Sequence, residues 1–275
     1  MPLPVDDALA AARAATAAAA ELLAGVRATD VRGKGNPRDL ITEWDPRSER
    51  VIRQVLHRRA PGVPVVGEEE GADGEVGPDG QRWLVDPIDG TVNFAHGLPL
   101  WSIVVALEDP DGIAVGVVDA PALGFCAWAR RGGGAWVSTR GGPAEPLAVS
   151  AVAELGRALL VTGFPADRAS NPDNNLAAWA HLQTRAGDCR RLGSAALDLV
   201  MVARGWFDGY WERRLHPWDV AAGALIVAEA GGRVTSTTGG RFDPWTGDVL
   251  ASNGGIHEAL RAALAEVPSS GASSP

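Results

Sequence analysis

Two aspartates three residues apart, Asp86 and Asp89, are the residues of this sequence whose type and spacing most clearly suggest chemistry. They lie in the run DPIDGT, directly after the apolar residues 83–85. Because Pro87 cannot continue a strand's hydrogen-bond ladder and an Asp-Gly pair favours a sharp turn, both carboxylates are expected at the end of a strand. Carboxylate oxygens at such a turn suit a hard divalent cation such as Mg²⁺. A plain surface turn remains the alternative, since Asp, Pro and Gly are common turn residues.

Two more acidic residues occupy similar settings. Glu68 follows an apolar strand through Gly67, and Asp219 stands at the start of an apolar helix. Because strand C-termini and helix N-termini gather at one edge of an α/β sheet, we expect these carboxylates to converge there and to need cations between them. Taken alone, Glu68 could belong to a solvated acidic loop, and Asp219 could be a helix N-cap.

A cluster of this kind suits phosphoryl chemistry. Metal ions can activate a water molecule and stabilise the attacking and leaving oxygens, and the helical turn expected after Gly90 could receive a phosphate on its free N–H groups. No Walker loop is present, which disfavours nucleoside triphosphate hydrolysis.

Composition narrows the classes of partner. The chain has 275 residues, 46% of them hydrophobic, and a formal net charge of −9. That charge argues against nucleic acid or an anionic membrane as the main partner. The two cysteines, Cys126 and Cys189, have no metal-binding spacing and indicate free thiols of a reducing compartment. With neither a secretory signal nor an apolar run long enough to span a bilayer, we expect a cytoplasmic protein.

The elements that position these residues follow a mixed pattern, which predicts an α/β fold. Apolar periodicity and capping residues predict helices at 6–26, 45–60, 174–186, 194–204, 220–230 and 257–266. Strands are expected at 63–66, 83–85, 101–107, 113–118, 125–129, 158–162, 206–212 and 249–251. Asp45 is the expected N-cap of the second helix. Residues 268–275 are expected to be a disordered tail.

Six longer segments carry a more specific signal. They are DLITEWD at 39–45, GEE at 67–69, WLVDPIDGTVNF at 83–94, GSAALDL at 193–199, DGYWE at 208–212 and PWDVAAG at 217–223. In this order and spacing, the sequence resembles the inositol monophosphatase family of Mg²⁺-dependent, lithium-sensitive phosphatases. The resemblance runs from about residue 8 to residue 265.

The resemblance implies a layered sandwich of alternating helices and sheets (αβαβα). It implies one catalytic domain over residues 1–267, with halves at about 1–145 and 146–267, and a homodimer. It also implies two or three Mg²⁺ ions that promote attack of water on the phosphate monoester of a small polyol, with inositol 1-phosphate as the leading substrate.

Roles for single residues follow from the same resemblance. The implied metal ligands are Glu68, Asp86, the carbonyl of Ile88, Asp89 and Asp219. Glu68 and Thr91 would hold the attacking water, and Asp45 would act through water on a third, weaker metal. The implied substrate contacts are Gly90, Thr91, Gly193, Ser194, Ala195, Glu212 and Asp219, and Lys34 matches a lysine of a mobile loop near the site.

Glu212 is the clue to specificity. A carboxylate accepts several hydroxyl hydrogen bonds and would repel a second phosphate, which favours a polyol monophosphate; a surface acid at a strand end is the alternative. We interpret Asp198 as a buried, hydrogen-bonded structural residue. Arg190 and Arg191 could attract phosphate, but we interpret them as a solvated pair or an intersubunit contact. Trp44 and Gly124 depart from the family pattern and could alter the outer metal site or the substrate preference.

Several other functions remain open. Histidinol phosphatase, fructose 1,6-bisphosphatase and 3′(2′),5′-bisphosphate nucleotidase share the broader fold. A non-catalytic, metal-binding regulatory protein is the alternative from another class, although every candidate metal ligand is present.

Overall fold

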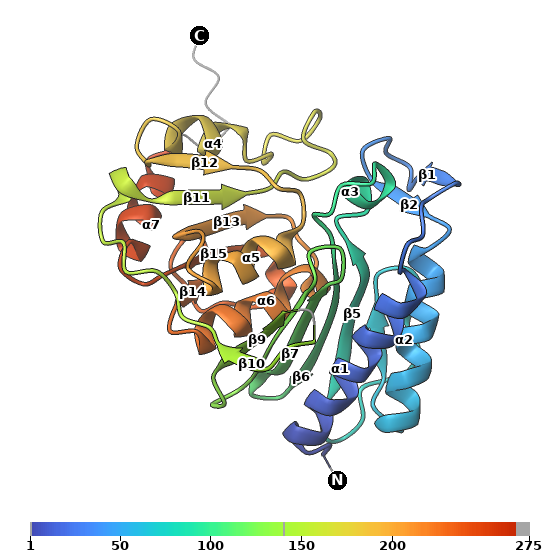
Figure 1. The fold of residues 1–275 in the computed structure, drawn as a ribbon. Helices are drawn as coiled ribbons and strands as arrows, with labels where there is room; N and C mark the ends of the chain where they lie inside the picture. Colours follow the sequence, from blue (N-terminus) through green and yellow to red (C-terminus); the bar gives the residue numbers. More distant parts are fainter. Residues whose placement is uncertain (1, 140, 268–275) are drawn as a thin grey trace.

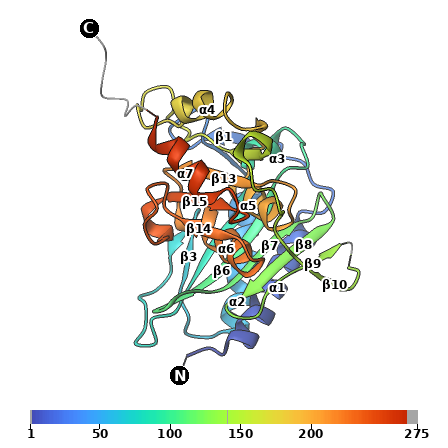
Figure 2. The same cartoon turned by 90° about the vertical axis from the view of Figure 1, so that its left-hand side faces the viewer.

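Two β-sheets alternate with three layers of helices in the computed structural model, which describes residues 2–139 and 141–267 (Figure 1). The outer layer on one side holds α1 (Val5–Leu22) and α2 (Asp45–Arg59), and the central layer holds α5 (Ala195–Ala203) and α6 (Pro217–Glu229). Figure 2, turned towards the second sheet, places α4 (Leu176–Leu182) and α7 (His257–Ala265) on its outer face. The αβαβα arrangement expected from the resemblance is thus confirmed.

The first sheet contains eight strands in the described part of the chain, in the order β10-β9-β8-β7-β6-β5-β3-β4. Its strands are β3 (Val65–Gly67), β4 (Gly71–Ala72), β5 (Arg82–Asp89), β6 (Ser102–Asp109), β7 (Gly112–Ala120), β8 (Phe125–Arg130), β9 (Ala135–Thr139) and β10 (Ala144–Pro146). Among the described strands of this sheet, only β3 and β5 pair in parallel, so their C-terminal ends, near Glu68 and Asp86, point the same way.

The second sheet has the order β12-β11-β13-β15-β14. It is formed by β11 (Leu159–Thr162), β12 (Asp188–Arg190), β13 (Gly209–Arg213), β14 (Arg233–Thr235) and β15 (Asp248–Ser252). A separate hairpin, β1 (Val31–Gly33) and β2 (Leu40–Thr42), and the short helix α3 (Thr91–Ala95) lie beside the end of β5. The short 3-10 turns η1 (Leu155–Arg157) and η2 (Pro244–Thr246) complete the elements.

Several predicted boundaries move for local reasons. β5 continues to Asp89, because a shift of register between Asp86 and Asp89 accommodates Pro87 inside the strand. Trp44, not Asp45, is the N-cap of α2, since the Asp45 carboxylate turns back to Thr42. The helix predicted at 220–230 begins earlier, at Pro217, whose fixed backbone angle suits the first turn.

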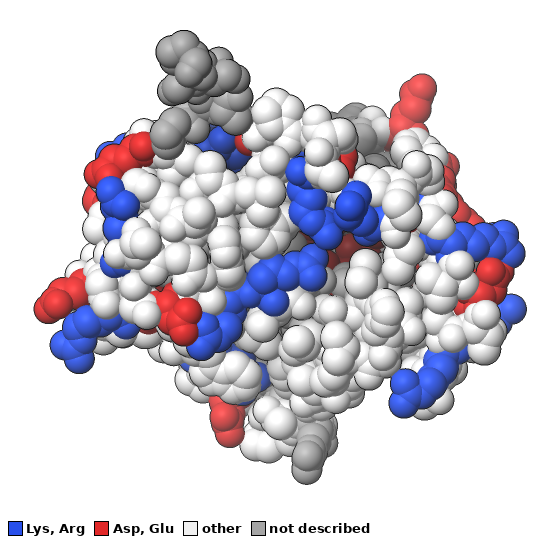
Figure 3. Space-filling model, turned by 90° about the horizontal axis from the view of Figure 1, so that it is seen from above, with Lys and Arg blue, Asp and Glu red and all other residues white. Residues whose placement is uncertain are grey.

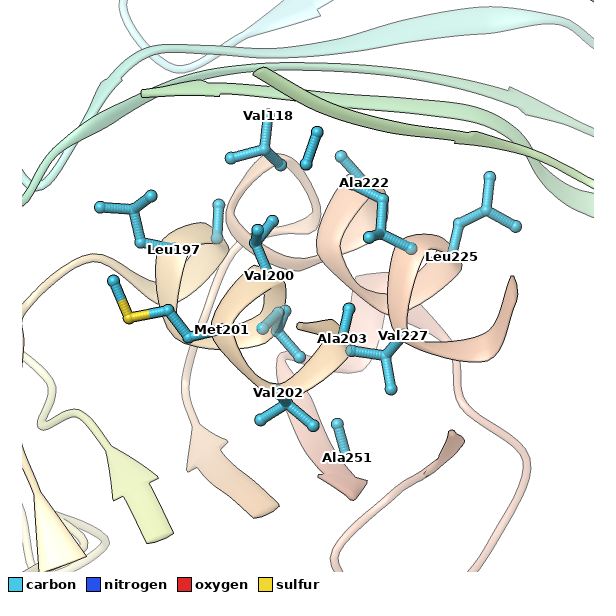
Figure 4. Packing of buried hydrophobic residues seen from close by; sticks show 14 of the residues in the cluster. Val118, Leu197, Val200, Met201, Val202, Ala203, Ala222, Leu225, Val227 and Ala251 are labelled. Carbon is cyan, nitrogen blue, oxygen red and sulfur yellow. The ribbon is translucent and has the colours of Figure 1, made fainter. Parts of the chain in front are cut away.

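Helices α5 and α6 form the core between the two sheets. Every residue of α5 is buried, as expected for a helix that is apolar on all sides except at Asp198. Figure 4 shows Leu197 and Val200 of α5 and Ala222 of α6 in one apolar cluster, with Val118 of the first sheet on one side and Ala251 of the second on the other. The two helices therefore hold the sheets at a fixed separation.

None of the helices in the described ranges combines the length and hydropathy that a membrane span needs.

Close packing of β7 against α6 gives a first prediction. A Cβ atom added to Gly116 would lie 2.7 Å from the Cα atom of Ala222, which is backbone and cannot rotate away. Gly116→Ala should therefore lower the free energy of unfolding by about 1–3 kcal/mol. The measurement is urea unfolding, with Gly77→Ala as the control because nothing lies within 4 Å of its added Cβ. Equal stability of the two variants would contradict this packing.

Candidate active site

One cavity of about 510 Å³ collects the acidic residues that the sequence singled out. Glu68 comes from the end of β3, Asp86 and Asp89 from β5, and Asp219 from the first turn of α6. The full acidic lining is Asp39, Glu68, Asp86, Asp89, Asp198, Glu212 and Asp219. The structure thus brings together acidic residues from three separate segments of the sequence.

Mutual repulsion marks the centre of this cavity. Burial raises the pKa of Asp86 well above its usual range, and the charges of Glu68, Asp89 and Asp219 raise it further. Burial also raises the pKa of Asp219 well above its usual range, and the charges of Glu68 and Asp89 raise it further. The hydrogen bond that Asp219 Oδ2 accepts from the His216 N–H at 2.7 Å opposes this rise. These carboxylates are therefore placed where a cation would relieve an unfavourable field.

Asp89 has a second set of contacts, with the N-terminus of α5. Its Oδ2 accepts hydrogen bonds from the Ser194 hydroxyl at 2.5 Å and the Ala196 N–H at 2.8 Å, and its Oδ1 accepts the Ala195 N–H at 3.2 Å. Burial raises the pKa of Asp89 to about 6, while these donors oppose the rise. Ser194 and Ala195, expected to contact substrate, thus hold Asp89 in place.

Thr91 joins the cavity to a buried carboxylate. Its hydroxyl lies 2.9 Å from Asp45 Oδ1 and 2.9 Å from the carbonyl oxygen of Ile88. Asp45 Oδ2 accepts the N–H and hydroxyl of Thr42 at 2.8 and 2.5 Å. Burial raises the pKa of Asp45, so this carboxyl group can hold a proton more readily than an exposed aspartate.

Comparison with known proteins decides the family. The model of the inositol monophosphatase family matches residues 4–269. The chain belongs to this family.

Relatives of known structure or name agree with this membership. The chain is 41% identical to the inositol-1-monophosphatase of Synechocystis, over 94% of this chain and 88% of that protein. The structure of inositol monophosphatase from Anabaena matches with a TM-score of 0.81 and 38% identity, covering 96% of both chains. The extragenic suppressor protein suhB from Bartonella henselae matches with a TM-score of 0.82 and 34% identity, over 95% of this chain and 98% of that one.

Lys34 lines the cavity and pairs with two glutamates at its acidic centre. Its Nζ atom lies 2.8 Å from Glu68 Oε1 and 2.6 Å from Glu69 Oε1. Burial lowers the pKa of Lys34, but the two glutamates outweigh it and raise that pKa overall. Burial and the charge of Glu68 raise the pKa of Glu69 to about 7. No sequence pattern indicates this contact with Glu69, because it depends on how the loop at 33–39 folds over the cavity.

Glu212 lies in another part of the same cavity. It is 6% exposed, which excludes the alternative of a surface acid, and its Oε2 accepts the Tyr210 hydroxyl at 2.8 Å. Burial raises the pKa of Glu212 to about 7, against the opposing effects of Tyr210 and Arg191. A Cβ atom on Gly163 would lie 2.2 Å from Glu212 Oε2, so only glycine leaves room for this carboxylate.

The structure bears on three predictions about neighbouring residues. Asp198 is 1% exposed and lines the cavity, but its Oδ1 has no hydrogen-bond partner among the described residues. Arg190 and Arg191 do not act as a pair, since Arg190 binds Asp188 at 2.6 Å and Arg191 lines the cavity. The indole N–H of Trp44 donates to the Arg27 carbonyl at 3.1 Å, and Trp44 is not among the residues that line the cavity.

The oxygen atoms that line the cavity suit a hard divalent cation as metal ligands. They are carboxylate and carbonyl oxygens, the ligands that Mg²⁺ takes together with several waters. Within residues 2–139 and 141–267, no group of three or more His, Cys, Asp or Glu side chains is arranged to hold a metal ion. Mg²⁺ commonly keeps several of its waters and needs only one or two carboxylates from the protein.

Asp198 yields a prediction about pH. Burial and the charge of Glu212 raise its pKa well above the usual value, so the folded protein keeps a proton that the unfolded chain releases. This difference destabilises the folded state as the pH rises above about 4. Asp198→Asn cannot ionise, and its stability relative to the natural protein should grow between about pH 5 and pH 8.

Urea unfolding in EDTA measures this trend. Asp111→Asn is the control, because the Asp111 side chain is 88% exposed. A stability difference for Asp198→Asn that stays constant with pH would contradict the account.

Proposed function

We propose that this protein is a Mg²⁺-dependent phosphatase that hydrolyses the phosphate monoester of a small polyol, with inositol 1-phosphate as its leading substrate. The observation that carries the proposal is the cavity in which the repelling carboxylates of Glu68, Asp86 and Asp219 border the turn at Gly90 and Thr91. The names of relatives such as the Synechocystis inositol-1-monophosphatase support the substrate.

The proposed metal ligands are Glu68, Asp86, the carbonyl of Ile88, Asp89 and Asp219, which would hold two or three Mg²⁺ ions. Bound Mg²⁺ would supply positive charge for the phosphate oxygens and lower the pKa of the attacking water. Asp89 would be a pre-oriented ligand, because the N-terminus of α5 fixes both of its oxygens.

Phosphate would bind at the turn that precedes α3. Gly90 has a φ of 94°, and a Cβ atom there would lie 3.0 Å from the Leu100 carbonyl oxygen and 3.1 Å from that of Gly193. Glycine is therefore required for this turn. The first N–H groups of α3 have no acceptor within the helix, so Gly90 and Thr91 can offer theirs to phosphate oxygens.

Thr91 and Asp45 would handle the proton of the attacking water. The Thr91 hydroxyl can donate to Asp45 and accept from the water at the same time. Because burial raises the pKa of Asp45, its carboxylate is a better proton acceptor than an exposed aspartate. Glu68, on the other side of the cavity, would orient the same water.

The polyol would lie against Gly193 and Glu212. Glu212 can accept hydrogen bonds from two ring hydroxyls, and Tyr210 holds its carboxylate in place. Ser194 and Ala195 would act mainly through Asp89, to which their donors are already bound.

Other features are proposed on the strength of family membership. We expect one catalytic domain over residues 1–267, because α5 and α6 pack against both sheets. A homodimer, inhibition by lithium and a cytoplasmic location are further expectations. Histidinol phosphate, fructose 1,6-bisphosphate and adenosine 3′,5′-bisphosphate are the competing substrates.

Phosphate release from inositol 1-phosphate and these three esters tests the proposal. Release should require Mg²⁺ and stop in EDTA. Asp86→Asn should lower kcat/KM by at least about a hundredfold, because a metal ligand is lost. Glu70→Gln is the control, since Glu70 binds Arg50 at 2.6 Å and does not line the cavity.

Two results would contradict the proposed function. Preference for one of the other esters would overturn the substrate while leaving the metal chemistry intact. Absence of phosphate release from all four would favour the non-catalytic, metal-binding alternative.

A further inference from the structure

A buried polar stripe on α2, formed by Asp45, Ser48 and Glu49, lies next to the segments that carry the acidic residues of the cavity. Figure 3 shows acidic side chains inside a hollow of the molecular surface, with Lys and Arg side chains on two sides of it. The polar stripe is hidden from that surface, because its three residues are each 0% exposed. Ser48 and Glu49 follow Asp45 by three and four residues, which places all of them on one face of the helix.

Each residue of the polar stripe binds a different part of the site. The Asp45 carboxylate accepts the Thr91 hydroxyl at 2.9 Å. The Ser48 hydroxyl donates to the carbonyl oxygen of Pro87 at 3.1 Å, inside the strand that carries two of the cavity's aspartates. Glu49 binds the turn that follows β3. One helix face therefore sets the positions of the two strand ends relative to each other.

Glu49 fixes the backbone of the turn after β3. Its Oε2 accepts the Glu69 N–H at 2.8 Å, and its Oε1 accepts the Glu70 N–H at 3.0 Å. The preceding N–H, that of Glu68, donates to the Val85 carbonyl of β5 at 3.2 Å. Three consecutive N–H groups are therefore bound, so the direction in which the Glu68 side chain leaves the backbone is fixed.

Arg53, one helical turn after Glu49, completes the attachment. Its Nε and Nη2 atoms donate to Glu49 Oε1 at 2.9 and 2.6 Å. Nη2 also donates to the Gly71 carbonyl at 2.5 Å, while Nη1 donates to the Val65 carbonyl at 3.3 Å and to Asp73 Oδ2 at 2.8 Å. Because hydrogen bonds from a charged donor are stronger than neutral ones, the guanidinium group joins α2 firmly to β3 and β4.

This anchor opposes a specific force. The negative charges of Glu68 and Asp86 repel each other in the cavity, and a mobile turn would let Glu68 move away. The Glu49 carboxylate has little freedom to follow such a movement, since a Cβ atom on Gly67 would lie 2.5 Å from its Cδ atom. The buried pair of Glu49 and Arg53 therefore keeps Glu68 where the repulsion is strongest.

We propose that Glu49, paired with Arg53, is a positioning residue that holds Glu68 where it can bind Mg²⁺. The inference rests on the proposed phosphatase function, which assigns Glu68 as a metal ligand. Glu49 is not among the residues that line the cavity, so it acts through the turn after β3. Residues that orient metal ligands typically contribute a factor of about 10 to 100 to metal affinity.

Mg²⁺ binding to the metal-free protein, measured by calorimetry, tests this role. Glu49→Gln replaces one acceptor oxygen by an NH₂ group that faces other donors, so its Kd for Mg²⁺ should be at least about tenfold higher than that of the natural protein. Glu108→Gln is the matched control, because Glu108 also binds an arginine, Arg82, at 2.5 Å, but does not line the cavity. It should keep the natural Kd.

Amide hydrogen exchange in the metal-free protein measures the position of the turn without any metal. The N–H groups of Glu69 and Glu70 should exchange at least about tenfold faster in Glu49→Gln than in the natural protein, because each loses a charged acceptor. Arg53→Lys is a second variant, needed if Glu49→Gln does not fold. It keeps a positive charge beside Glu49 but lacks the fork of five donors, so both measurements should change in the same direction.

Two results would overturn the proposal. One is a natural Mg²⁺ affinity in Glu49→Gln and Arg53→Lys. The other is an equal loss of affinity in Glu108→Gln, which would trace the effect to general destabilisation. Failure of the proposed function is a different result, in which the natural protein itself binds no Mg²⁺. Amide exchange then decides the positioning role, since faster exchange in Glu49→Gln supports it and unchanged exchange overturns it.

Discussion

Repulsion among the carboxylates that meet in one cavity is the constraint on which the rest of the structure depends. Asp86 and Asp219 come from two elements and lie beside Glu68, and the raised pKa values of these two aspartates show that their charged forms are less stable there than in water. The fold holds them together because the strand ends and the helix that carry them are fixed by packing elsewhere. In the absence of a cation, the pKa values of Asp86 and Asp219 are raised, because protonation of these carboxylates removes the repulsion.

The scaffold resists this repulsion through α5. Its buried apolar surface packs between the two sheets, and its N-terminal donors hold Asp89 of the first sheet. A single helix thus links the core to a proposed metal ligand. Rigid support of this kind is what a functional site needs, because a loosely held carboxylate would move away from its neighbours.

The residues that could be predicted from the sequence are those whose role is local. Gly90 predicted the turn that precedes α3, although the strand runs on through Pro87 to Asp89, and the apolar runs predicted most strands of the first sheet. The sequence reasoning missed contacts that depend on distant loops. No local pattern indicates that Lys34 reaches Glu69, that Gly163 makes room for Glu212, or that Arg191 faces the cavity while Arg190 does not. The predicted start of α2 near the site also differs from the structure, because Asp45 accepts a hydrogen bond from Thr42 instead of capping its own helix.

Mg²⁺ binding to the metal-free protein, measured by calorimetry at pH 7 in buffers of different ionisation enthalpy, tests the central claim most directly. Carboxyl groups with raised pKa values hold protons that a bound cation displaces, as the pKa of about 6 for Asp89 illustrates. The account predicts that binding releases protons, and that the number released falls as the pH rises towards 8. Binding without proton release, or no binding at all, would show that repulsion between these carboxylates does not organise the site.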